Sequence, residues 1–157
     1  MAIVTLNGND YIVFVNTVDA TTAEPDEENY RPLMCIIDSS FAGSTDTIEV
    51  SNKCGSGSGW QGALPGVKSF TITGTAHAID ETLEPSAASY QEVAELWHAG
   101  QTFWAKIANK QDNQGTVYIR EAVVFISDYT ENQGLNEAMT FDFTLQGVGE
   151  PRLSTTS

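Results

Sequence analysis

The chain has 157 residues, of which 41% are hydrophobic and 18% are charged, as expected for one globular domain with a core of ordinary size. Lys and Arg number 7 against 21 Asp and Glu, so the formal net charge is -14 and disfavours a surface that grips nucleic-acid phosphates. No apolar run approaches the roughly 20 residues that cross a bilayer, and the N-terminus lacks the pattern of a signal peptide. We therefore expect a single domain over residues 1–157, made in a cytoplasm and not inserted in a membrane.

The first third of the chain predicts short strands around an acidic loop. Residues 10–18 are rich in β-branched and aromatic residues, which indicates a first strand. Residues 19–31 are acidic but lack the glycine and the ligand spacing of an EF-hand, so we interpret them as a solvated loop. Residues 32–38 predict a short apolar strand, and residues 45–51 alternate as a half-exposed strand does.

A glycine-rich loop then leads into a long alternating stretch. Residues 52–66 lack the Gly-Lys-Ser/Thr ending of a phosphate-binding loop, and we expect them to form an interaction loop. Trp60, Leu64 and Pro65 are its candidate subunit-contact residues, although Trp60 packing on its own core is the alternative. Residues 67–79 alternate apolar residues with small hydroxyls, which predicts a strand with one buried and one solvated face.

One helix is predicted, over about residues 89–99. Ser89 followed by Glu92 three residues later forms a capping-box pattern, and Gly100 stands where a helix C-cap belongs. The helix should bury one apolar stripe against a sheet. The stripe consists of Val93, Leu96 and Trp97.

The rest of the chain predicts three further strands. Residues 102–108 and 116–129 follow each other across a polar turn, and the second has apolar residues on both faces. Residues 138–149 alternate most clearly, and we expect a short tail from about residue 150. Seven or so strands, one helix and no βα alternation predict a mostly β fold, an antiparallel β-sandwich or partly closed barrel with one flanking α-helix.

The sequence predicts no catalytic, cofactor-binding or metal site. Asp128 and Asp142 are the best acid/base pair, but surface strands carry such acids routinely. His77 has no nucleophile at a recognisable spacing, and Cys35 and Cys54 form no metal-binding motif with the histidines. The chemistry of the chain therefore favours assembly over catalysis.

Three segments in order resemble the major tail protein family of long-tailed bacteriophages, whose members build the tail tube. They are GWQGALPGVKSFTITG at 59–74, SYQEVAELWHAGQTFWAKI at 89–107 and YIREAVVFISDYTENQGLNEAMTFDFTLQGVGEP at 118–151. The resemblance covers about residues 45–151. It implies hexameric rings that stack into a tube, with a tape-measure protein, a tail terminator and distal tail proteins as partners. It also implies that DNA passes through without specific binding, and that the protein resides in the virion tail after assembly in the host cytoplasm.

If the chain forms such a tube, we expect the polar faces of the 67–79 and 138–149 strands to line the bore. Hydroxyls and acids there would keep the surface hydrated and would not trap phosphates. The alternative is that this face lies on the outside of the tube, since a solvated strand has the same pattern on either side. A monomeric acidic β-sandwich that serves as a recognition or accessory virion module is the competing function. The candidate bore residues are Thr71, Thr73, Thr75, Thr140, Asp142 and Thr144.

Overall fold

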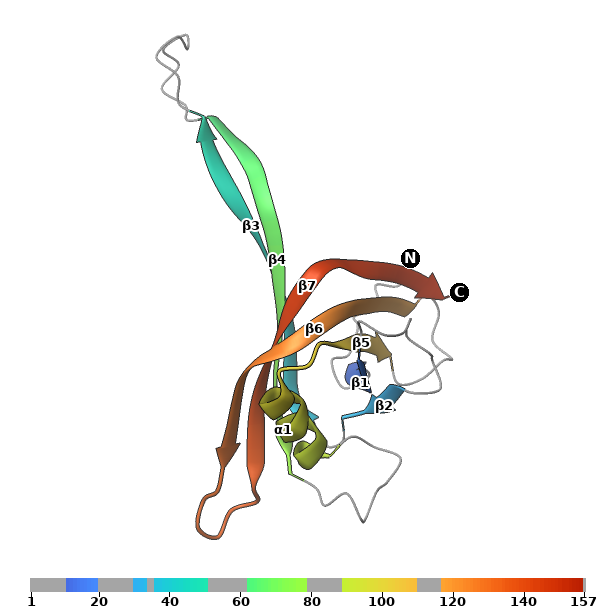
Figure 1. Cartoon of the computed structure of the whole chain (residues 1–157), viewed down its shortest axis with the longest axis vertical. Coiled ribbons are helices and arrows are strands. Elements are labelled where there is room, and N and C mark those ends of the chain that lie inside the picture. Colours follow the sequence, from blue (N-terminus) through green and yellow to red (C-terminus); the bar gives the residue numbers. More distant parts are fainter. Residues whose placement is uncertain are drawn as a thin grey trace, which may run out of the picture.

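The structure is a computed structural model that describes residues 11–19, 30–33, 36–50, 62–78, 89–109 and 117–156. Its strands and helix appear in the order seen in Figure 1. They are β1 (Tyr11–Asp19), β2 (Tyr30–Pro32), β3 (Ile36–Val50), β4 (Gly62–His77), α1 (Tyr90–Ala99), β5 (Phe103–Asn109), β6 (Val117–Asn132) and β7 (Thr140–Thr156).

The seven strands form a single antiparallel sheet in the order β2-β1-β5-β6-β7-β4-β3. The sheet is not closed into a barrel, but it bends until β1 contacts β3, which lies far from it in the strand order (Figure 1). The β1, β2 and β5 part therefore faces the β4 and β7 part across a common core. These features confirm the predicted mostly β, antiparallel fold with one flanking helix.

The core forms where alternating strands turn their apolar side chains inward. In β4, Phe70 and Ile72 are 5% and 2% exposed, and in β7, Phe143 and Leu145 are 2% and 1% exposed. The register sets Ile72 directly opposite Leu145, so the apolar residues of the two strands share one face. Burial of each such side chain contributes about 1.5–3 kcal/mol to folding. The alternation in the sequence is thus the direct cause of this face.

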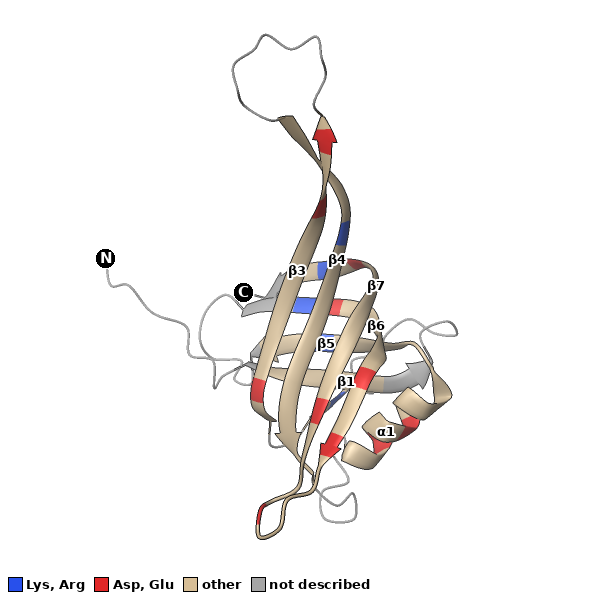
Figure 2. Ribbon diagram, turned by 90° about the vertical axis from the view of Figure 1, so that its left-hand side faces the viewer, with Lys and Arg blue, Asp and Glu red and all other residues tan. Residues whose placement is uncertain are grey.

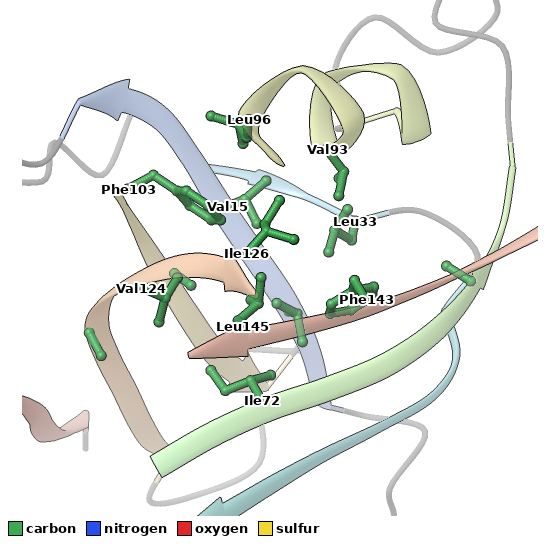
Figure 3. Close-up of a cluster of buried hydrophobic side chains, with 14 of the residues drawn as sticks. Val15, Leu33, Ile72, Val93, Leu96, Phe103, Val124, Ile126, Phe143 and Leu145 are labelled. Carbon is green, nitrogen blue, oxygen red and sulfur yellow. The ribbon is translucent and has the colours of Figure 1, made fainter. Parts of the chain in front are cut away.

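The helix closes the core from the side of the buried face, as Figure 3 shows. Val93 and Leu96 point from α1 toward side chains of β1 and β6, including Val15 and Ile126. The Ser89 hydroxyl accepts a hydrogen bond from the Glu92 backbone N–H at 3.4 Å. At the other end, Gly100 adopts φ 65° and its N–H returns to the last turn. The predicted helix and both caps are confirmed, but the buried stripe is narrower than expected, because Trp97 is 47% exposed.

Three predicted boundaries differ from the structure. The single strand expected over 32–38 is divided, because β2 ends at Pro32 and pairs with β1, whereas β3 begins at Ile36 and pairs with β4. The loop expected over 52–66 is shorter, since β4 already begins at Gly62. The tail expected from residue 150 is instead strand to Thr156, because the last part of β7 pairs with the first part of β6.

Candidate functional site

A continuous polar surface covers the sheet face opposite the core on β4 and β7. Residues directly opposite each other in an antiparallel pair point to the same face. All six residues predicted to line a bore are brought together here, each beside a polar partner. The pairs are Thr71 with Gln146, Thr73 with Thr144, Thr75 with Asp142 and His77 with Thr140.

The polar surface extends to the strands on either side. On β3, Ser40 lies opposite Thr73 and Asp38 opposite Thr75. On β6, Asp128 lies opposite Thr144 and Thr130 opposite Asp142. We call these outward positions of β3, β4, β7 and β6 the polar face; it consists of Asp38, Ser40, Thr71, Thr73, Thr75, Asp128, Thr130, Asn132, Thr140, Asp142 and Thr144.

Side-chain hydrogen bonds connect neighbouring strands across the polar face. The Thr75 hydroxyl donates to Oδ1 of Asp142 at 2.5 Å, and the Asn132 amide donates to Oδ2 at 2.8 Å. Further along, the hydroxyls of Ser40 and Thr73 lie 2.7 Å apart. Asp142 is thus bound from β4 on one side and from β6 on the other.

The same contacts set the charge of Asp142. The hydrogen bond from Thr75, followed by that from Asn132, lowers the pKa of this carboxyl below its usual value, and partial burial opposes the change. Asp142 is therefore ionised at neutral pH. No Lys or Arg occupies any of the described positions of the polar face, and acids concentrate on this part of β3, β6 and β7 (Figure 2). The surface is hydrated and negative, so it repels phosphates.

The polar face lies on the four neighbouring strands β6, β7, β4 and β3. The two outer strands of this group, β3 and β6, each have an edge that is unpaired over part or all of its length. Among the described strands, β3 pairs only with β4, so its other edge is open along Ile36–Val50. On the opposite side, β5 pairs with β6 only up to Val124. Residues 125–132 of β6 therefore pair with no further described strand on that side, although α1 packs against this part of β6 through Trp97 and Tyr129. Open edges of this length are templates for pairing with another chain.

A two-stranded projection rises from the sheet beyond the polar face (Figures 1 and 2). We call it the arm; it consists of residues 43–50 of β3 and 62–69 of β4, which pair with each other. None of β4 before Thr71 pairs with β7. Ile48 and Leu64 are cross-strand partners and are 54% and 55% exposed. The arm thus presents apolar side chains that no described part of the chain covers.

The three residues predicted to contact a neighbouring subunit have different outcomes. Leu64 and Pro65 lie on the arm, where both are exposed. Pro65 is not in a turn, because it pairs with Thr47 beside a register shift in the β3–β4 ladder. Trp60 lies outside the described residues. Two further exposed apolar residues of the arm, Val50 and Val67, were not singled out from the sequence, although both stand in β-rich runs.

On the helix side of the molecule, an aromatic contact joins α1 to β6. Trp97 stacks on Tyr129 with ring centroids 6.3 Å apart, and the Tyr129 hydroxyl donates to Glu131 at 2.9 Å. Burial and the neighbouring Glu131 carboxylate raise the pKa of Tyr129, so its hydroxyl stays protonated. Within the described ranges, no group of three or more His, Cys, Asp or Glu side chains is arranged to hold a metal ion.

Solved structures with the same fold come from tail assemblies. A chain in the virion of a native gene transfer agent particle has a TM-score of 0.69 at 16% identity, with 98% of this chain and 100% of that chain covered. A chain in the SPP1 tail tube has a TM-score of 0.68 at 14% identity, covering 97% and 80%. A chain in the baseplate of the anti-feeding prophage has a TM-score of 0.62 at 9% identity, covering 98% and 97%.

Sequence comparison gives the family directly. A search of curated proteins finds no significant match. The family model for the phage tail tube protein, however, matches residues 5–152, which is nearly the whole chain. Within the described ranges, no helix is long and apolar enough to cross a membrane. The chain therefore belongs to the phage tail tube protein family and is a structural component of a virion tail.

Proposed function

We propose that copies of this chain assemble into hexameric rings, that the polar face lines the bore, and that the rings stack into a conduit for DNA. The observation that carries the proposal is a four-stranded, acidic face bounded by two open strand edges. The tail of an empty gene transfer agent particle, a structure of the same fold at 17% identity, has C6 symmetry, which supports six copies per ring here. The role is structural and not catalytic.

The directions of the strands support ring closure. β3, β4, β7 and β6 alternate in direction, so the two outer strands of the group run opposite ways. Rotation about a ring axis brings β6 of one copy beside β3 of the next, and these edges are antiparallel as sheet pairing favours. With strands about 4.8 Å apart, six copies give a circumference of about 115 Å and a diameter of about 37 Å before strand tilt widens it. Such a bore admits a DNA duplex.

The arm supports contact between successive rings. It extends past the sheet, and its pair of exposed apolar side chains, Ile48 and Leu64, is available to a second copy. Burying both in an interface would contribute a few kcal/mol per subunit, at about 25 cal/mol per Å² of apolar area. Higher salt should aid assembly, because it screens subunits of formal charge -14.

A stack of identical rings has no intrinsic length, because a head-to-tail interface that does not close grows indefinitely. The proposal therefore includes partners that set the length and cap the ends. We propose a tape-measure protein inside the bore, a tail terminator and distal tail proteins for these roles, as the resemblance to the major tail protein family implies. Assembly would take place in the host cytoplasm.

The decisive experiment places lysine on the polar face. Thr73→Lys and Asp142→Lys should slow or abort DNA ejection, because each adds six phosphate-attracting charges around the bore, while tubes still form. Gln91→Lys and Glu95→Lys on α1 introduce the same charge changes on the other side of the sheet and serve as matched controls.

Ejection at the wild-type rate in the two polar-face variants would place this face on the outside of the tube. Purified wild-type protein is tested separately by sedimentation and negative-stain imaging. A strict monomer at all concentrations and salt conditions would contradict the ring proposal and favour a recognition module.

A further inference from the structure

The turn between β6 and β7 presents one leucine at the end of the molecule opposite the arm (Figure 1). We call this turn the tip; it consists of residues 133–139. The Glu137 backbone N–H donates to the Gly134 carbonyl at 3.4 Å, and Asn136 adopts φ 63° at the third position of the turn. Leu135 is 91% exposed, the most exposed large hydrophobic residue of the described chain. The turn thus holds an apolar side chain outward in a defined conformation.

A second, apolar surface is a groove at the base of the arm, on strands β3, β4 and β7. Its volume is about 780 Å³, and its floor is formed by Phe41 and Phe70, whose rings stack 5.4 Å apart. Phe70 lies against Gly147, where an added Cβ would meet its ring at 2.2 Å. Val67, on one wall, is 74% exposed. We call this the root groove; its walls are apolar and open to solvent.

The root groove and the tip carry charges of opposite sign. Lys68 lines the root groove, and the Arg120 guanidinium lies 4.5 Å from the Phe41 ring centroid. Glu150 is the acid among the groove residues. The tip and the end of β6 that leads into it carry Glu137 and Glu131, and neither the tip nor residues 125–132 of β6 contain Lys or Arg. Lys68 and Arg120 together outweigh Glu150 by one positive charge, so a tip that approaches a root groove is attracted.

We infer that the root groove of one copy receives the tip of a second copy, with Leu135 on the Phe41–Phe70 floor. The inference rests on the proposed stacking of rings and names one contact between them. The occupant is a second copy because the tip ends the β6–β7 pair on the side away from the arm (Figure 1), whereas the root groove lies at the base of the arm, so the tip of a chain does not reach its own groove. The interface is head-to-tail, and such interfaces build filaments.

The first test compares two truncations in the tip. Leu135→Ala should raise the critical concentration for tube formation at least about tenfold, because each ring-to-ring contact loses most of a buried leucine. Gln133→Ala, in the same exposed turn, should leave it unchanged. Folding of both variants should match wild type by circular dichroism, since the Leu135 side chain is almost fully solvated in the subunit.

The second test is a disulfide between copies. With Cys35→Ser and Cys54→Ser as background, Leu135→Cys combined with Val67→Cys should give a ladder of covalent oligomers after oxidation of tubes. Leu135→Cys with Leu153→Cys, a residue that is exposed but outside the groove, is the control and should give none. Tubes without a ladder, or tubes from Leu135→Ala at the wild-type concentration, would overturn the tip contact and leave the ring proposal standing. A wild-type protein that never forms tubes would overturn both.

Discussion

The two halves of β4 belong to one strand but have different surroundings. From Phe70 to His77 the strand lies between β3 and β7, and its apolar side chains are buried; Ile72, for example, is 2% exposed. From Gly62 to Ser69 it pairs with β3 alone, and Leu64 is 55% exposed. Leu64 stands at an even position, as the buried Phe70, Ile72 and Ala76 do, but no described part of the chain covers it.

A register shift between the two halves decides which face those residues occupy. Between the pairs Thr45–Lys68 and Thr47–Pro65, β4 advances three residues while β3 advances two. A one-residue slip moves every following side chain to the opposite face. Leu64 and Ile48 therefore continue the side of the polar face, whereas Phe70 faces the core. The comparison teaches that one local irregularity in the register turns apolar side chains of the same strand from the core face to the exposed face.

The largest effect on assembly is expected from charged residues placed on the apolar face of the arm. The double variant Ile48→Asp, Leu64→Asp should abolish tubes while the subunit keeps its melting temperature, because both side chains are exposed in the monomer. The control Thr47→Asp, Ala63→Asp adds the same charge to the opposite face of the arm. Sedimentation and negative-stain imaging measure the outcome, and normal tubes from the first variant would show that the arm face is not an interface.

A smaller effect separates the buried half of β4 from the arm through one glycine in each region. A Cβ at Gly74 would lie 2.6 Å from the Phe143 ring and 3.0 Å from the Asp38 carbonyl oxygen, so Gly74→Ala should lower the free energy of unfolding by about 1–3 kcal/mol. A Cβ at Gly43, at the base of the arm, would meet nothing within 4 Å. Gly43→Ala should change stability by no more than about 0.5 kcal/mol. Urea denaturation of both variants checks the prediction, and equal effects would contradict the packing difference.

The smallest expected effect concerns the hydrogen bond between Thr75 and Asp142 on the polar face. The folded-state pKa of Asp142 lies below its usual value of 3.8, so its stabilising contribution is present above that value and is lost as the pH falls through the folded-state pKa. Thr75→Val should raise the pKa of Asp142 and remove less than about 1 kcal/mol of stability at neutral pH. The difference from wild type should vanish in strong acid.

Carboxyl titration by NMR measures this change directly. Thr71→Val is a matched control, because Thr71 lies on the same strand and face but opposite Gln146. If the Asp142 pKa is the same in Thr75→Val as in wild type, the threonine is not its main stabilising partner.

Much of the fold follows from local patterns in the sequence. The capping residues Ser89 and Gly100 determine both ends of α1, and the alternation in β7 determines which of its side chains are buried. The six polar residues chosen from that alternation on β4 and β7 do share one face, because the register pairs the two strands directly. Whether this face lines a bore depends on other copies of the chain, and a single sequence does not contain that information.

The arm, the tip and the root groove were beyond sequence reasoning for physical reasons. The arm depends on a register shift beside Pro65, which resembles ordinary turn chemistry when only the sequence is read. The root groove joins Phe41, Phe70 and Gly147, which lie on three strands far apart along the chain. Leu135 stands alone in a polar turn and carries no periodic signal. Long-range pairing creates the arm and the root groove, whereas the outward position of Leu135 follows from the local turn at residues 134–137.

The two open edges of the sheet also govern when assembly begins. A free subunit with unpaired edges on β3 and β6 would join other copies at every encounter if nothing opposed it. Its formal charge of -14 slows encounters between identical subunits, so the first ring is the slow step. In the proposed tube, a subunit that joins an existing ring gains contacts to the ring below at once, and edge pairing follows as its neighbours are added. Growth is then faster than new nucleation, and tubes elongate from a few starting points instead of forming many short fragments.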